Sequence, residues 1–124
     1  MPTRKTPFAL SPEEARRVEQ VDLLAAEGEQ GLPRLLELLT DPSWKVRRSV
    51  IAALAALGSP AVEPLCELLR EDRSDEARIA AAVDALVASV ADVVGPVMRL
   101  SEHASPPVVA DAAQVLGRRR PVAE

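Results

Sequence analysis

The sequence predicts an all-α protein, an α-solenoid of stacked helical hairpins, and three observations support this prediction. Apolar residues recur at three- and four-residue intervals over short segments, as they do on the buried side of a helix. Proline, glycine and serine fall between these segments and separate them. The chain also superposes on itself after a constant shift, which places Pro33 on Pro64 and Asp41 on Asp72. A fixed period of paired helices predicts a stack in which each pair covers its neighbour.

The best-formed hairpin spans Gly31–Gly58. Leucines repeat on one side of Pro33–Leu39, and this pattern predicts a first helix with proline in its first turn. Asp41-Pro42-Ser43 should end that helix, because a residue that precedes proline avoids the helical region. The serine of this break is a suitable N-cap for a second helix over Trp44–Leu57. The final glycine stands where a left-handed residue is needed.

The same pattern predicts a helix before this hairpin and four helices after it. Ser11-Pro12-Glu13-Glu14 has the residue types of a capping box and opens a helix over Pro12–Glu27, in which the shift aligns Leu23 with Leu54. The later helices are expected over Ala61–Glu71, Asp75–Val90, Val93–Glu102 and Val108–Arg119. About seven helices therefore make three repeats and an N-terminal half repeat.

Length and composition are consistent with one domain, and we expect a repeat domain over 11–119, a flexible arm over 1–10 and a tail over 120–124. The net charge of −4 and the two aromatic residues, Phe8 and Trp44, argue against unspecific nucleic-acid binding. A lone Cys66 gives no disulfide framework. The first residues lack the apolar core of a signal peptide, and no apolar run is long enough to cross a membrane. These features predict a cytoplasmic protein without a membrane partner.

The second-helix segment VRRSVIAALAALG, at Val46–Gly58, and the first-helix segment Pro33–Leu39 resemble the HEAT-like repeats of bacteria, of the type found in phycobilisome lyases. The resemblance extends over roughly Ala15 to Arg119 and implies the solenoid fold. In that family, aspartate and arginine columns form a ladder between repeats. The resemblance implies such a structural role for Asp41, Arg47, Asp72 and Arg78, with Arg16 as a further rung. His103 and Val109 occupy these columns in the last repeat, so we expect the ladder to stop before it.

The sequence offers no catalytic constellation, and we predict no enzyme activity, no cofactor and no metal site. The only possible nucleophile–base pair is Cys66 and His103, which stand at different places in successive repeats. A metal hydroxylase that resembles the HEAT-type deoxyhypusine enzymes would need several His-Glu pairs, and the chain has one histidine.

The predicted function is that of a non-enzymatic protein-interaction module, an adaptor or regulatory scaffold of a bacterial cytoplasm that holds its partner along the second helices. The expected contact residues are Trp44, Lys45, Arg48, Ile79, Ala82, Val83 and Gln114. Two alternatives stay open: nucleic-acid binding through Arg17, Lys45, Arg48 and Arg118–Arg120, and an accessory subunit of a lyase-like enzyme. A homodimer through the C-terminal repeat is a separate hypothesis, based on Val93, Val97, Val108 and Val109.

Overall fold

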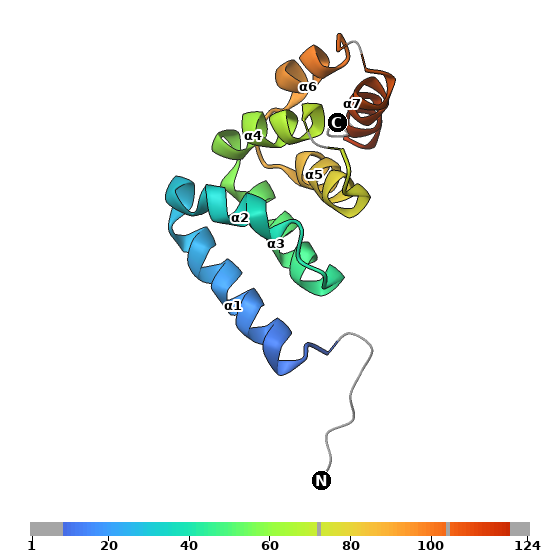
Figure 1. Cartoon of the computed structure of the whole chain (residues 1–124). Helices are drawn as coiled ribbons and strands as arrows, with labels where there is room; N and C mark the ends of the chain where they lie inside the picture. The colour runs from blue at the N-terminus through green and yellow to red at the C-terminus, as the bar shows by residue number, and fades with distance from the viewer. Residues whose placement is uncertain (1–8, 72, 104, 120–124) are drawn as a thin grey trace.

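The computed structural model describes residues 9–71, 73–103 and 105–119, which form seven α-helices and one short 3₁₀ helix in two rows. The first row consists of the second helices of the repeats, each packed on the next: α1 (Pro12–Ala26), α3 (Trp44–Leu57), α5 (Glu76–Ala88) and α7 (Pro106–Arg118). The other row consists of first helices, each packed on the second helix that follows it: α2 (Leu32–Leu38), α4 (Ser59–Arg70) and α6 (Val94–Leu100). The stack runs from α1 at one end to α6 and α7 at the other (Figure 1). The predicted all-α solenoid is confirmed.

Local side-chain contacts explain where the second helices begin. At the start of α1, the Ser11 N–H donates to Glu14 Oε1 at 2.8 Å and the Glu14 N–H donates to Ser11 Oγ at 3.1 Å, which is the predicted capping box. Ser43 and Asp75 each accept the N–H of the residue three positions later, at 3.3 and 3.1 Å. Each cap satisfies a helix-end donor that has no partner within the helix.

Two glycines permit tight joints that no other residue would allow. Gly58 connects α3 directly to α4, with φ of +78° and ψ of −135°, a region that is essentially restricted to glycine. Because of this joint, α4 begins at Ser59 rather than at Ala61 as predicted. At the end of the 3₁₀ helix η1 (Gly28–Gly31), a Cβ on Gly31 would lie 2.2 Å from the carbonyl oxygen of Leu24. The missing side chain therefore lets η1 pack directly on α1.

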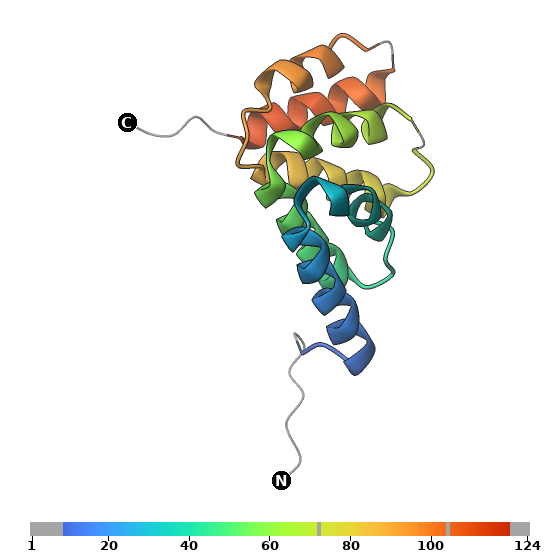
Figure 2. The ribbon, with the colours of Figure 1, turned by 90° about the vertical axis from the view of Figure 1, so that its left-hand side faces the viewer.

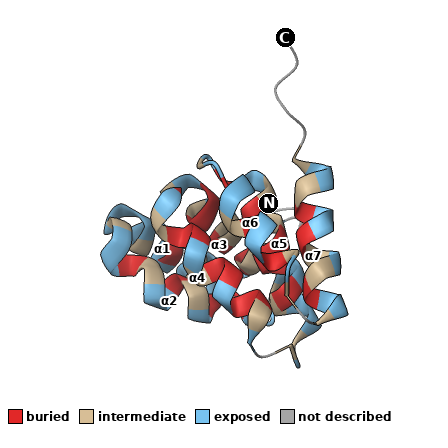
Figure 3. Cartoon of the chain, turned by 90° about the horizontal axis from the view of Figure 1, so that it is seen from above, coloured by how far each residue is buried: buried red, intermediate tan, exposed pale blue. Residues whose placement is uncertain are grey.

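The core lies between the two rows of helices and consists mostly of leucine, valine and alanine. The largest fully buried side chains come from both rows and include Leu35, Leu54, Leu65, Leu86 and Leu100. Figures 2 and 3 show the two rows from other directions, and in Figure 3 the buried residues lie where helices face one another while exposed residues lie outward. Because each helix buries one side against its neighbours, no hairpin has a complete core of its own.

The repeat register follows the N-caps of the second helices rather than a constant shift. These caps are Ser11, Ser43, Asp75 and Ser105. The interval from Ser11 to Ser43 equals the interval from Ser43 to Asp75. Each of these two intervals is one residue longer than the shift that places Asp41 on Asp72. Leu54 and Leu86 stand at the same distance from their respective caps, and both are fully buried. The constant shift is therefore one residue short for the first two intervals.

The burial of α1 differs from the prediction. Leu23 is 66% exposed, so its predicted place in the buried Leu54 column is wrong. The cap register does not supply a replacement, because Asp22, which stands as far from its cap as Leu54 does, is exposed as well. α1 lies at the end of the stack, packs on η1, α2 and α3, and buries Val21 instead.

Candidate functional site

The row of second helices carries three adjoining hollows on its exposed side, and we call the surface that they form the second-helix face. They lie between α1 and α3, between α3 and α5, and between α5 and α7, with volumes of about 390, 520 and 490 Å³. Trp44 and Arg48 line the first two hollows, and Ala80 lines the second and third. The hollows therefore follow one another without interruption along the stack.

Three of the predicted contact residues lie at the start of α3 on this face. Trp44 is the first residue of the helix and is 48% exposed. The Nζ of Lys45 donates to the carbonyl oxygen of Ala9 at 2.7 Å and so holds the segment that precedes α1. Arg48 is exposed and makes no hydrogen bond or ion pair with any described residue. The structure thus brings a half-exposed indole and an unpaired guanidinium together at the junction of two hollows.

Three further predicted residues lie around the hollow between α5 and α7. Gln114 is exposed at its edge, whereas Ile79 and Val83 are 9% and 2% exposed. Ile79 and Val83, both expected contact residues, are therefore largely covered within the chain. α5 packs against α3, α4 and α7, and these neighbours cover Ile79 and Val83, whereas Ala77, Ala80 and Ala88 of the same helix stay exposed.

Ala82 lies outside all three hollows. Its side chain is fully buried, so the prediction that it contacts a partner is wrong. Ala82 stands as far from its cap, Asp75, as Val50 stands from Ser43, and it occupies the same buried place in the stack. The constant shift aligns it with the partly exposed Ile51 instead.

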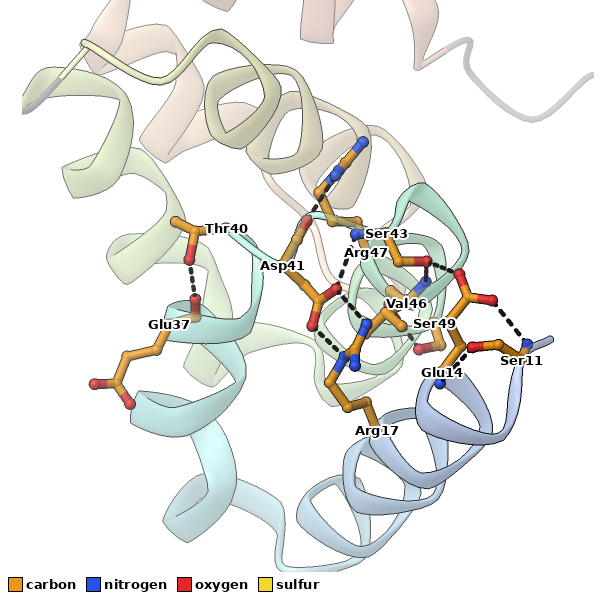
Figure 4. A network of polar contacts seen from close by, with 10 residues as sticks. All are labelled: Ser11, Glu14, Arg17, Glu37, Thr40, Asp41, Ser43, Val46, Arg47 and Ser49. Carbon is orange, nitrogen blue, oxygen red and sulfur yellow. Dashed lines mark hydrogen bonds and ion pairs between the residues drawn. The ribbon is translucent and has the colours of Figure 1, made fainter.

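A buried ion pair joins α1 to the loop between α2 and α3. Arg17 donates from Nε and Nη2 to the two carboxylate oxygens of Asp41, at 2.8 and 3.4 Å, and the N–H of Ser43 donates to the same carboxylate at 2.9 Å. Arg47 donates to the backbone carbonyl of Asp41 at 2.6 Å rather than to its side chain. Figure 4 shows these contacts together. The rung thus comes from Arg17 and not from Arg16.

A second ion pair continues this linkage toward the C-terminal repeat with the charges exchanged. Nη2 of Arg73 lies 2.7 Å from Oδ2 of Asp111 in α7. Arg73 stands two residues before the N-cap Asp75, as Asp41 stands two residues before the N-cap Ser43. Asp111 stands six residues after the N-cap Ser105, as Arg17 stands six residues after the N-cap Ser11. The expected end of the aspartate and arginine columns therefore does not end the polar linkage, because this exchanged pair continues it to α7. The predicted rung of Asp72 and Arg78 involves a residue, Asp72, that lies outside the described residues.

His103 takes over one local role of Asp41 in the last loop. Its Nδ1 accepts the N–H of Ser105 at 3.1 Å, as the carboxylate of Asp41 accepts that of Ser43. Both acceptors stand two residues before the N-cap of a second helix. The same local hydrogen bond therefore forms before both helices although the accepting side chains differ.

A family model described as HEAT repeats matches residues 9–86, which is more than half of the chain. The chain belongs to the HEAT-repeat family. HEAT repeats generally mediate protein–protein interaction, and this match carries no finer subtype. It ends within α5, and α6 and α7 add one further hairpin of the same kind. No curated protein and no solved structure matches the chain.

The valines of the last HEAT hairpin are used inside the chain. Val93, Val97 and Val108 are fully buried, and Val109 is partly buried. The three buried valines belong to the core between α6, α7 and the preceding hairpin. The homodimer hypothesis therefore rested on side chains that are mostly covered within one copy.

The arginines at the end of α7 are also engaged within the HEAT stack. Arg118 pairs with Asp84 of α5 at 2.8 Å. Arg119 donates to four backbone carbonyls at the end of α5, those of Leu86, Val87, Ser89 and Ala91, at 2.7 to 3.3 Å. Arg120 lies outside the described residues. Arg17, Arg118 and Arg119 therefore bind other groups of the chain, and they are most of the described cations that were expected to form a nucleic-acid site.

The groups considered for catalysis are far from a reactive arrangement. Cys66 is fully buried in α4, and burial, with a smaller effect of Glu63, raises the pKa of its thiol to about 11. In the described part of the chain, no three or more His, Cys, Asp and Glu side chains are grouped to hold a metal ion. Nor does any described helix have the length and apolar character needed to cross a membrane.

Proposed function

We propose that this HEAT-repeat protein is a non-enzymatic interaction module, an adaptor or regulatory scaffold that binds another protein along the second-helix face. The observation that supports the proposal is the position of Trp44 and Arg48, exposed and adjacent at the junction of two hollows. Tryptophan and arginine are enriched among the residues that dominate interface energies. A row of stacked helices offers them an extended surface for a partner.

The alternatives have less support. Nucleic-acid binding needs cations that are free to neutralise phosphates, and Arg17, Arg118 and Arg119 bind other groups of the chain. An accessory subunit of a lyase-like enzyme would still have to hold its companion on an exposed surface. That alternative therefore describes one kind of partner for the same face.

A photo-crosslinking experiment in cells of the source organism tests which face binds. A photoreactive amino acid is placed at Ala80, an exposed residue that lines two hollows, and as a control at Glu37, an exposed residue of α2. We expect protein adducts from Ala80, fewer adducts after the additional change Arg48→Glu, and few from Glu37. Adducts from Glu37 alone, or adducts at Ala80 that nuclease removes, would overturn the proposal.

A further inference from the structure

The hollow between α3 and α5 is positively charged although the whole chain carries a net charge of −4. Arg47, Arg48 and Arg118 line it, and Asp84 is the only acidic residue among its lining residues in the described structure. Asp84 already pairs with Arg118, and Arg47 bonds to a backbone carbonyl rather than to a carboxylate among the described residues. The described residues that line this hollow therefore carry more positive than negative charge.

The exposed carboxylates of the first helices lie away from this hollow. Exposed carboxylates of the first helices include Glu37 of α2 and Glu63 and Glu67 of α4. Each of the three lies close to an arginine of its own or the neighbouring first helix. None of them lines a hollow of the second-helix face. A partner in the hollow between α3 and α5 thus meets three arginines and, among the described lining residues, the single carboxylate of Asp84.

The floor of the hollow between α3 and α5 is made of small apolar side chains. Ala77, Ala80, Ala81 and Ala88 of α5 line it, opposite Ile51 of α3. Alanines leave room above the helix backbone, and this room gives the hollow its volume of about 520 Å³. A partner packs well in such a groove only if its own side chains are large enough to fill the space above the alanines.

We infer that the groove between α3 and α5 takes an acidic segment of the partner protein, with a carboxylate at Arg48 and large apolar side chains over the alanine floor. The inference rests on the proposed function and adds the chemistry of the partner. A carboxylate forms two parallel hydrogen bonds with a free guanidinium, which fixes its position as well as adding affinity. Trp44 lines the same groove and supplies a flat apolar wall beside that pair.

A polypeptide fits the groove better than a nucleic acid does. The lining is mostly aliphatic, and Trp44 is the only aromatic side chain among the described lining residues, so successive bases have no stacking platform. α3 has 14 residues and is about 21 Å long at 1.5 Å per residue. A helical segment of about 12 residues would lie along most of it.

The test is a selection from a display library of random peptides of about 12 residues on the folded protein, run in parallel on wild type, Arg48→Glu and the control Arg34→Glu. Arg34 is an exposed arginine of α2, so its variant makes the same charge change on the opposite row. We expect wild type to enrich peptides with Asp or Glu beside Leu, Ile or Phe. The affinity of an enriched peptide is then measured by the fluorescence of Trp44, which is the only tryptophan of the chain.

Loss of one charged hydrogen-bonded partner predicts about a tenfold weaker peptide affinity in Arg48→Glu and little change in Arg34→Glu. Ala80→Leu, which fills the groove at an exposed position without a charge, should weaken binding as well. Circular dichroism checks that each variant is folded. Enrichment of basic or uncharged peptides, no enrichment, or an equal loss in Arg34→Glu would overturn the inference. So would tighter binding of a single-stranded DNA oligonucleotide at the same site.

The two proposals fail in different ways. Cross-links from Ala80 to proteins in cells, combined with no preference for acidic peptides, would overturn the acidic segment and leave the proposed function intact. Acidic peptides that bind in an Arg48-dependent manner, without such cross-links in cells, would support the groove chemistry and contradict the proposed function.

Discussion

Replacing Asp41 with alanine tests whether the buried ion pair holds the N-terminal half repeat to the stack. The side chain of Asp41 is 5% exposed and that of Arg17 is 33% exposed, so water only partly replaces a lost contact. One of the two guanidinium bonds is short, at 2.8 Å, and the other is long, at 3.4 Å. We therefore count one charge-assisted bond, which contributes about 2 kcal/mol. The variant also deprives the Ser43 N–H of its acceptor, at a cost of about 1 kcal/mol.

The expected loss of unfolding free energy is thus about 3 kcal/mol, measured by urea denaturation with far-UV circular dichroism and with Trp44 fluorescence. A double-mutant cycle isolates the pair. Arg17→Met and Asp41→Asn, alone and together, should show a coupling of about 2 kcal/mol. Asp41→Asn retains an oxygen for the Ser43 N–H and should cost less than Asp41→Ala. The exposed pair of Arg34 and Glu37 is the control, because Glu37→Ala should cost less than about 0.5 kcal/mol.

A loss below about 1 kcal/mol in Asp41→Ala, or additive effects of the two single changes in the cycle, would refute this reasoning. Either result would mean that the hydrophobic contact of α1 with α3 joins the half repeat without help from the ion pair. A curve in which Trp44 and circular dichroism report different midpoints would show that α1 leaves the stack before the rest unfolds.

Two other predictions concern titratable groups. Hydrogen bonds from the backbone N–H of Ser11 and, to a smaller extent, from the hydroxyl of Ser43 lower the pKa of Glu14 from 4.5 to about 2. The folded state therefore favours the ionised carboxylate. The stabilising effect of Glu14 is present above pH 4.5 and is lost as the pH falls toward 2. Glu14→Gln should therefore lower the melting temperature at neutral pH and differ little from wild type near pH 2. Glu13→Gln, at the neighbouring position, should lower it less at neutral pH, because it removes a first-turn charge but not the capping box. The second group is Cys66, which is buried and has a thiol pKa raised to about 11. It should react with iodoacetamide about 100-fold more slowly than a free cysteine until urea unfolds the chain. Rapid labelling of the native protein would show instead that α4 opens.

The sequence predicted the elements well because their ends depend on local chemistry. The bounds of α3, Trp44–Leu57, agree with the structure at both ends, since Ser43 and Gly58 act through contacts within a few residues. The positions of most helix ends elsewhere differ by one or two residues. The repeated hairpin also predicted the stacking, because neither helix of a hairpin buries all its apolar residues without a neighbour.

Contacts between repeats were harder to predict because they depend on the lengths of the loops. A loop that is one residue longer rotates the next helix relative to any fixed alignment. The constant shift therefore aligned the buried Ala82 with the partly exposed Ile51 instead of with the buried Val50. Similarly, the burial of Ile79 and Val83 depends on how far α7 covers α5, and no pattern within α5 contains that information. Trp44 and Arg48 could be placed correctly because they stand close to a cap that the sequence does reveal.

Arg119 ties the end of one repeat to the end of the one before it. Its guanidinium binds carbonyls in and after the last turn of α5, and Val87 and Ala88 of that turn line the groove between α3 and α5. The shape of this groove thus depends on a side chain from the next hairpin, which itself lies outside the groove. A fragment that ends before residue 119 would retain every lining residue of α3 and α5 and still lose the contact that fixes the end of the groove. The groove accordingly needs more of the chain than the residues that line it, and one repeat cannot be exchanged for another without changing its shape.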